Sequence, residues 1–268
     1  MTRPSWVTDG IDLSRPSASR VYDFYLGGFH NFSSDRDMAE QAIKDWPELP
    51  LIMRSNRAFL RRAVSHLVGQ GVRQFLDIGS GIPTVGNVHE VAQDLAPDSR
   101  IVYVDIDPVA VAHSEAILAD NPNATVIAGD FRDPGKTLTD SRVTDRLDLD
   151  QPVALLLVAL LHFVGDDAAP AEVIATFRDA LAPGSYLAIS HATHELHPPE
   201  VTAFHRDLYR QTATPMTMRT QAQVEGLFEG FELIEPGVVL SEQWHPDAGE
   251  VAPHPERFPI WAGIGRKP

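Results

Sequence analysis

Residues 72–81 read VRQFLDIGSG, an apolar run that ends in a carboxylate and a glycine-rich turn. The run 72–78 suits a buried strand, and we expect the following helix, over about 84–96, to stop before Pro97. Glycines at 79 and 81 let a ligand approach the backbone closely, because no Cβ intervenes. The alternative is a tight strand–helix turn capped by Asp77, and this stretch alone leaves both interpretations open.

The same alternation of short apolar runs and helical stretches continues along the chain. It predicts an α/β fold, a doubly wound sheet of seven strands in which an antiparallel last strand replaces the all-parallel six-strand dinucleotide arrangement. The expected strands after the first are 101–105, 125–128, 153–158, 186–190, 231–240 and 259–265. The expected helices are 108–119, 170–182, 199–211 and 221–228, the last with a capping box from Thr220 and Gln223, while 129–150 is expected to be irregular.

Residues 1–70 are predicted to form an N-terminal helical extension, and residues 71–268 the sheet domain, in one continuous structural unit. The expected helices are 18–26, capped by Ser17, then 35–46, capped by Ser34, and 51–68. Apolar residues of the third helix form one stripe, with Arg54, Arg57 and Arg61 on the opposite face, where we expect solvent. Asn56 falls inside the stripe and therefore needs a polar partner.

Composition narrows the function. The 268 residues carry a net charge of −15 and a sequence pI near 5.0, which disfavours binding to nucleic acids and anionic membranes. The chain has no Cys, which rules out disulfides, thiolate metal sites and a cysteine nucleophile. Residues 1–19 lack the apolar stretch of a signal peptide, and the longest apolar run, 153–164, is too short to span a bilayer. We expect a cytoplasmic protein.

Two carboxylates lie at the carboxyl ends of the first two predicted strands. Asp77 stands two residues before the first glycine, where it would repel a pyrophosphate and would suit a cationic ligand such as S-adenosylmethionine (SAM). Thr84 occupies the position of the third glycine of the dinucleotide fingerprint. Asp105, 24 residues beyond Gly81, is placed to accept both hydroxyls of a ribose. Its rival, Asp107, is more suited to capping the helix that begins at Pro108.

Three further residues would complete a nucleoside site. Ile106 would lie against an adenine face, an interpretation compatible with an ordinary core position. Asp130 would accept a hydrogen bond from the adenine amino group, and the backbone N–H of Phe131 would donate to a ring nitrogen. Taken alone, Gly129-Asp130 is typical of a turn. Three carboxylates that each follow a strand of one parallel sheet favour the ligand.

These motifs resemble the SAM-binding motifs of class I methyltransferases, which share a Rossmann-like sheet. The chain also resembles, from about residue 5 to 268, a bacterial family of SAM-dependent methyltransferases first catalogued as a domain of unknown function. The residues that carry this closer resemblance are 20–23 (RVYD), 26–28 (LGG), 31–32 (NF), 54–60 (RSNRAFL), 161–163 (LHF) and 184–191 (GSYLAISH). The resemblance implies SAM binding and methyl transfer to an unassigned acceptor. Residues 82–84 (IPT) depart from the small residues common in this loop.

Acceptor chemistry and closure of the site depend on other residues. His162 and His191 follow the fourth and fifth strands and are candidate catalytic bases, although His162 also suits a neutral histidine bonded to the backbone. The histidines at 191, 194 and 197 lack an acidic partner, and no metal is expected. The N-terminal helices would close over the cofactor with a hinge at Gly27-Gly28, so that Tyr22, Gly28 and Asn31 face the ligand; the alternative is simple packing on the edge of the sheet.

The sequence therefore predicts a SAM-dependent methyltransferase that acts on a small molecule by in-line methyl transfer. A SAM-binding regulatory protein without catalysis stays open, since cofactor binding and acceptor chemistry use different residues. A nicotinamide-dependent enzyme is disfavoured by Asp77 and Thr84.

Overall fold

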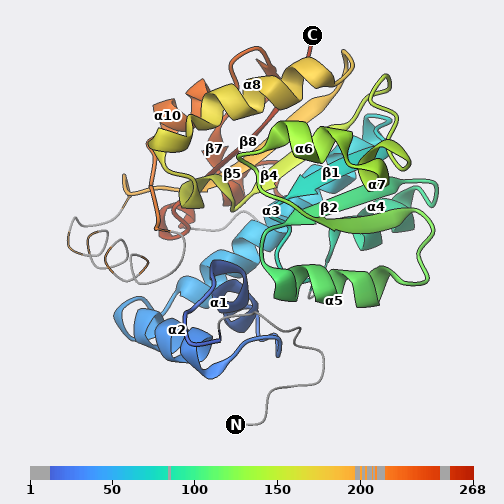
Figure 1. Cartoon of the computed structure of the whole chain (residues 1–268). Coiled ribbons are helices and arrows are strands. Elements are labelled where there is room, and N and C mark those ends of the chain that lie inside the picture. Colours follow the sequence, from blue (N-terminus) through green and yellow to red (C-terminus); the bar gives the residue numbers. More distant parts are fainter. Residues whose placement is uncertain are drawn as a thin grey trace.

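The computed structural model describes residues 13–83, 86–196, 215–247 and 254–268, together with positions 200, 203, 207 and 209 (Figure 1). Thr84, His197 and nearly all of the helix expected over 199–211 lie outside these residues. Within the described part, no helix is both long enough and apolar enough to cross a membrane.

A single mixed sheet organises the chain, in the order β3-β2-β1-β4-β5-β8-β6, with β7 paired to β8. Its strands are β1 (Gln74–Ile78), β2 (Arg100–Asp105), β3 (Ala124–Ala128), β4 (Ala154–Val158), β5 (Tyr186–Ala192), β6 (Glu232–Leu233), β7 (Val239–Leu240) and β8 (Ile260–Arg266). The first five strands are parallel, and β8 runs antiparallel to β5, β6 and β7. The strand order reverses between β1 and β4, which is where ligands bind in open α/β sheets. The predicted doubly wound sheet with its antiparallel end is confirmed.

The strand predicted over 231–240 is in fact two short strands. Pro236 lacks a backbone N–H, and Gly237 has φ +85°, so the chain turns between β6 and β7 instead of continuing one ladder. Each short strand pairs with β8: Glu232 lies opposite Arg266, and Val239 lies opposite Ala262. The expected antiparallel pairing is thus confirmed, with eight strands among the described residues instead of seven.

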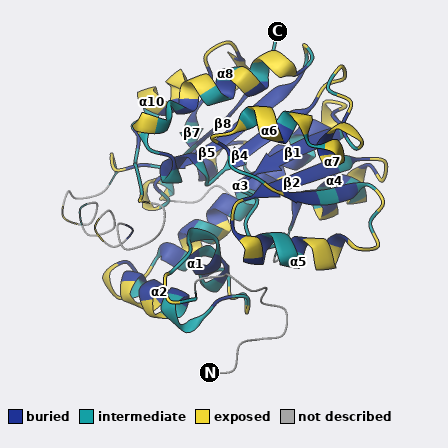
Figure 2. Cartoon of the chain, viewed as in Figure 1, coloured by how far each residue is buried: buried dark blue, intermediate teal, exposed yellow. Residues whose placement is uncertain are grey.

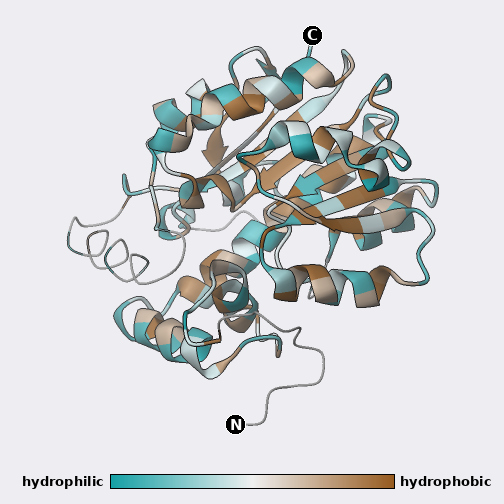
Figure 3. Cartoon of the chain, viewed as in Figure 1, coloured by the Kyte–Doolittle hydropathy of each residue, from teal (hydrophilic) through white to brown (hydrophobic). Residues whose placement is uncertain are grey.

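Helices cover both faces of the sheet, and side chains of each strand alternate between them. Phe75 of β1 packs in a core with α3 (Leu49–Gly69) and α4 (Val88–Leu95). Its neighbour Leu76 faces a second core, which includes residues of α8 (Pro170–Ala180) and α10 (Gln221–Gly226). The five parallel strands are accordingly largely buried and apolar, while the outer faces of the helices are exposed (Figures 2 and 3).

The remaining helices connect these elements. They are α5 (Pro108–Leu118), which contacts β2 and β3, and two short helices in the stretch expected to be irregular, α6 (Pro134–Thr139) and α7 (Ser141–Thr144). Asp133 and Asp140 cap the two short helices by accepting backbone N–H bonds, so the expectation of an irregular stretch is wrong at these two helices. The predicted capping box of Thr220 and Gln223 begins α10.

The N-terminal helices α1 (Ala18–Tyr25) and α2 (Ser33–Asp45) build a third core with the first turns of α3 (Figure 1). Helix α3 is 21 residues long, about 31 Å at 1.5 Å per residue, and its later turns belong to the core under the sheet. One helix therefore joins the N-terminal extension to the sheet.

Helix α2 begins differently from the prediction. Ser34 lies inside the helix, and its Oγ donates to the backbone oxygen of Leu13. The buried carboxylate of Asp35 instead accepts the backbone N–H of Phe32 at 2.8 Å. An aspartate in the first turn is also favoured by the helix dipole. Asp35 therefore caps the start of α2, the role expected for Ser34.

Candidate functional site

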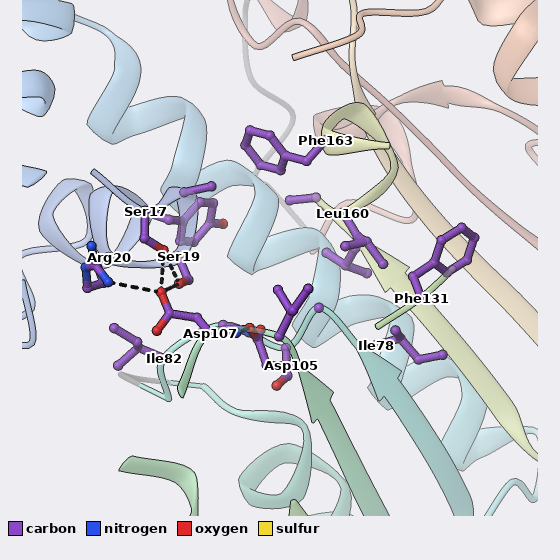
Figure 4. Close-up of a pocket in the computed structure, with 18 of the residues that line it drawn as sticks. Ser17, Ser19, Arg20, Ile78, Ile82, Asp105, Asp107, Phe131, Leu160 and Phe163 are labelled. Atoms are coloured by element: carbon purple, nitrogen blue, oxygen red, sulfur yellow. Dashed lines mark hydrogen bonds and ion pairs between the residues drawn. The ribbon is translucent and has the colours of Figure 1, made fainter. Parts of the chain in front are cut away.

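A cavity of about 580 Å³ opens at the carboxyl ends of β1, β2, β3 and β4, within the range of small-molecule pockets (Figure 4). Helices α1 and α3 supply its opposite wall. Its lining consists of residues 77–82, 105–108, 129–132, 158–160, 163 and 164 from the sheet side, and 15–20, 22, 56, 57 and 60 from the N-terminal side. The topological switch point of the sheet is therefore the place where the N-terminal extension meets it.

The glycine loop after β1 has the backbone geometry that its sequence predicted. Gly79 and Gly81 have φ values of +71° and +68°, which side chains rarely adopt. A Cβ on Gly79 would lie 2.6 Å from Cδ1 of Leu160, so only glycine fits there without a shift. The glycine loop after β1 therefore packs closely against Leu160, which follows the neighbouring strand β4.

The loop's amides are already bonded within the protein. The N–H groups of Gly79 and Ser80 donate to the backbone oxygen of Val104 at 2.8 and 3.3 Å. The N–H of Gly81 donates to Oδ2 of Asp105 at 2.7 Å. A glycine loop that cradles a pyrophosphate needs such amides pointing at the ligand. These three residues do not offer them.

Asp77 is 5% exposed and lines the cavity. Burial raises its pKa from 3.8 to about 7, with Arg57 opposing the rise and Asp105 adding to it. Tyr103 lies close enough on β2 for Asp77 to raise the pKa of that phenol. The cavity therefore contains a carboxylate that is costly to ionise unless a cation comes to it.

Asp105 and Asp107 have separate partners. Burial raises the pKa of Asp105 to about 6, and its oxygens accept the backbone N–H groups of Gly81 and Asp107. Asp107 accepts the N–H of Val109 at 2.8 Å and so caps α5, as predicted. Between the two, Ile106 lines the cavity with 60% of its surface exposed, which excludes the core position allowed by the sequence.

The second oxygen of Asp107 links the sheet to α1. It accepts bonds from the hydroxyls of Ser17 and Ser19 and from Nη1 of Arg20 at 3.4 Å (Figure 4). Arg20 also donates from Nε to Asp35 at 2.9 Å, so this buried guanidinium joins α1, α2 and the start of α5. Local patterns do not predict this cluster, because Ser17, Ser19 and Arg20 are 87–90 residues away from Asp107 in the chain.

Asp130 and Phe131 also line the cavity, after β3. Asp130 forms an ion pair with Arg132, whose hydrogen bonds lower the pKa of that carboxyl. Phe131 is buried, and its ring stacks on Phe177 of α8 with centroids 6.2 Å apart. Both predicted residues thus reach the cavity.

On the opposite wall, a chain of hydrogen bonds runs from α1 to β4. Tyr22 donates to the backbone oxygen of Met53 and accepts from Nδ2 of Asn56 at 2.9 Å. Oδ1 of Asn56 accepts from the hydroxyl of Ser190 at 2.6 Å, and that hydroxyl accepts from the N–H of Ala159 at 2.9 Å. Asn56, expected to need a polar partner, is therefore satisfied by side chains of two other elements.

Arg57 does not lie on the solvated face expected for it. It is half-buried and lines the cavity, while Arg54 and Arg61 are exposed as expected. Its guanidinium lies 5.9 Å from the centroid of the Tyr22 ring. The available signal was its place next to Asn56, one step round the helix from the apolar stripe.

The two histidines predicted as bases do not line the cavity. His191 is fully buried on β5, with Nδ1 at 2.8 Å from the backbone oxygen of Ala192 and Nε2 at 2.9 Å from Arg219. Burial lowers its pKa to about 3 and that of His162 well below the usual value, so both are neutral. Nδ1 of His162 accepts the N–H of Ala192 at 3.4 Å. Both histidines therefore hold neighbouring parts of the described structure together, and their geometry does not support a role as catalytic base.

Gly28 and Asn31 also lie away from the cavity lining. Nδ2 of Asn31 donates to Oδ2 of Asp23 at 2.9 Å and to the backbone oxygen of Gly28 at 3.0 Å. A Cβ on Gly28 would lie 2.0 Å from Oδ1 of Asp23. These residues close the turn after α1, and of the three predicted extension contacts only Tyr22 lines the cavity.

Comparison with known protein families matches residues 4–268 to the S-adenosyl methyltransferase family. The chain belongs to this family. Two solved structures are similar to this chain throughout: a DUF574 family protein from Streptomyces avermitilis MA-4680, 41% identical with a TM-score of 0.91, and a methyltransferase candidate from Thermobifida fusca YX, 42% identical with a TM-score of 0.91. The alignments cover 96% and 98% of this chain and 99% of each relative. Comparison with curated proteins finds no match.

More distant structures share the fold alone. One is the N-methyltransferase NodS from Bradyrhizobium japonicum WM9 in complex with S-adenosyl-L-homocysteine, 14% identical, with a TM-score of 0.51 over 93% of this chain and 99% of that one. The S-adenosyl methyltransferase family establishes SAM as the cofactor. The cavity fits SAM, because its buried carboxylates favour a cation and its glycine-loop amides are not available to a pyrophosphate.

Proposed function

We propose that this methyltransferase acts on a small molecule and binds SAM in the cavity through Tyr22, Asp77, Gly79, Gly81, Asp105, Ile106, Asp130 and Phe131. The observation that carries the proposal is the buried carboxylate of Asp77 beside a glycine loop whose amides are already bonded. This arrangement attracts a positively charged nucleoside and repels a dinucleotide.

The proposed contacts follow the order of the strands. Asp77 attracts the ammonium and sulfonium of SAM, and Asp105 accepts hydroxyls of the ribose with the lone pairs that its two backbone bonds leave. Ile106 offers an exposed apolar surface to the adenine. Asp130, oriented by Arg132, accepts from the adenine amino group. Each role matches the chemistry of the side chain and its position at or just beyond the carboxyl end of a strand.

When bound, SAM supplies a methyl group on a sulfonium that leaves as a neutral thioether. The protein aligns the acceptor with that methyl group and excludes water. Val158, Leu160 and Phe163 give this part of the cavity an apolar wall near the end of β4. The cavity volume of about 580 Å³ favours a small acceptor, and the net charge of −15 opposes nucleic acids.

The bonds between α1 and Asp107 support a second part of the proposal, that α1 and α2 act as a lid. They hold the N-terminal helices against the loop that follows β2, at the rim of the cavity. Opening the lid would require breaking the contacts of α1 with Asp107, including its buried ion pair with Arg20, whereas the pair of Arg20 with Asp35 joins α1 to α2 within the lid.

Thermal shift and turnover test the proposal. SAM at about 100 times its Kd should stabilise the protein by about 2.7 kcal/mol, S-adenosylhomocysteine should also stabilise it, and NAD should not. Labelled methyl groups should then enter a low-molecular-mass metabolite extract and not RNA or protein fractions. Stabilisation by NAD alone would refute the cofactor assignment, label in a macromolecule would refute the small acceptor, and SAM binding without turnover would indicate a regulatory protein.

A further inference from the structure

We infer that Arg57 binds the α-carboxylate of the methionine portion of SAM, so that α3 belongs to the cofactor site. The inference rests on the proposed function and adds a residue that the family motifs of the sheet do not contain. It follows from what Arg57 contacts, from what the other donors of the cavity already bind, and from the charge that faces it.

Arg57 has an unused donor. Its Nε is buried and has no hydrogen-bond partner within the described part of the chain. No ion pair joins its guanidinium to a carboxylate among the same residues. A buried N–H without an acceptor is unfavourable, and a guanidinium matches a carboxylate with two parallel bonds. Because Arg57 lines the cavity, a ligand there can supply the missing acceptor.

The other charged donors of the cavity are engaged or exposed. Arg20 is bound by Asp35 and Asp107, and Arg132 is bound by Asp130. Arg15, also in the lining, is exposed. Among the arginines that the structure describes in the lining, Arg57 is therefore the half-buried one that has no carboxylate partner.

The backbone donors described in the first part of the loop, residues 79–81, do not replace it. The amides of Gly79, Ser80 and Gly81 are bonded to Val104 and Asp105. Helix α4 begins only at Val88, and the side chain of Glu90 accepts the N–H of the residue that caps it. The hydroxyl of Ser80, which also lines the cavity, is buried without a partner in the described part of the chain and can add one bond to the same anion. Beside the described residues 79–81, an anion therefore depends on side chains, and chiefly on Arg57.

The charge opposite Arg57 identifies the anion. Asp77 also lines the cavity, and the two groups influence each other, since Arg57 opposes the rise in the pKa of Asp77. They form no direct ion pair within 4.0 Å. A cation and an anion held apart in one cavity match the carboxylate and ammonium of an amino acid. The methionine portion of SAM carries both groups on one carbon.

The test compares SAM with decarboxylated SAM, which keeps the nucleoside, sulfonium and amine but lacks the carboxylate. Titration calorimetry measures both affinities for the wild type, Arg57→Met and Arg57→Lys. Arg54→Met is the matched control, because Arg54 is exposed on the same helix and does not line the cavity. Far-UV circular dichroism and the unfolding midpoint verify that each variant is folded.

We expect the wild type to bind SAM at least tenfold more tightly than decarboxylated SAM. Arg57→Met should lose this preference: its SAM affinity falls tenfold or more, and its affinity for decarboxylated SAM changes far less. Arg57→Lys should keep part of the preference, and Arg54→Met all of it. The comparison of ligands cancels the effect of Arg57 on the ionisation of Asp77, because both ligands carry the amine.

Three results would overturn the inference. Equal weakening of both ligands by Arg57→Met would make Arg57 a structural residue. Unchanged SAM affinity in that variant, with loss of turnover only, would assign Arg57 to an anionic acceptor. If the wild type bound SAM without any preference over decarboxylated SAM, no carboxylate site would exist, whatever the variants did. A wild type that binds neither ligand would instead refute the proposed function, and this inference with it.

Discussion

Replacing Asp77 with Asn should make the ligand-free protein more stable at pH 8 while weakening SAM binding. Burial raises the pKa of Asp77 from 3.8 to about 7, so the folded state holds this proton more tightly than the unfolded chain does. Stability is therefore lost as pH rises from about 4 to about 7, because the buried carboxyl must ionise. Asn has nearly the same shape and stays neutral at every pH.

The magnitude follows from the pKa. The difference between 3.8 and about 7 corresponds to about 4 kcal/mol at roughly 1.4 kcal/mol per pKa unit, which is the upper limit. We expect about half, because the amide that replaces the carboxylate also needs hydrogen-bond partners. A gain of about 2 kcal/mol corresponds to an increase in Tm of roughly 4–8 °C for a chain of this size.

Differential scanning calorimetry between pH 4.5 and 8.5, without ligand, measures this effect. The Tm of Asp77→Asn should exceed that of the wild type at pH 8, and the difference should shrink toward pH 4.5. Asp98→Asn is the control, since that side chain is 77% exposed and should show no such trend. A variant less stable than the wild type at pH 8, or a difference independent of pH, would refute the reasoning.

Three further predictions test the loop, the lid and the histidines. Gly79→Ala should lower the free energy of unfolding in urea more than Gly81→Ala. Both positions have a positive φ, which costs an alanine about 1–2 kcal/mol, but only a Cβ at position 79 would contact Leu160. Equal losses in the two variants would contradict this close contact. Arg20→Met should lower the free energy of unfolding by about 3–5 kcal/mol and speed hydrogen exchange in α1 and α2. Removing the exposed ion pair between Arg257 and Glu48 should lower it by at most about 1 kcal/mol. Unchanged hydrogen exchange in Arg20→Met would argue against the lid contact. His191→Asn should lower the unfolding midpoint yet keep the methyl-transfer rate, whereas a loss of about 10²–10⁴-fold in rate would restore the histidine as a base.

Much of the fold could be predicted because its signals are local. Each parallel strand is a short apolar run, and Pro108 and Pro170 mark helix starts within a residue of the structure. Two expectations are wrong although their signals are also local. Pro236 divides one expected strand into two, and Asp133 caps a helix inside a stretch expected to be irregular.

The cavity was predicted in part. Asp77, Asp105 and Asp130 could be placed in it because residues that follow parallel strands meet at one edge of a sheet. The same rule suggested His162 and His191, and there it was insufficient. A residue's position at the end of a strand does not determine which way its side chain points, and both rings pack into the protein next to Ala192.

The sequence by itself determined which segments form the parallel strands, where the glycine turn lies and that the ligand site is acidic, since each of these features depends on residues close together in the chain. Only the tertiary structure decided that Arg57 turns to the cavity, that Arg20 joins Asp35 to Asp107, and that Asn56 connects Tyr22 to Ser190. These contacts bring together helices and strands as much as 134 residues apart, and their geometry is set by how α1 and α3 pack on the sheet. The pattern of apolar residues along the chain does not predict how these helices pack on the sheet.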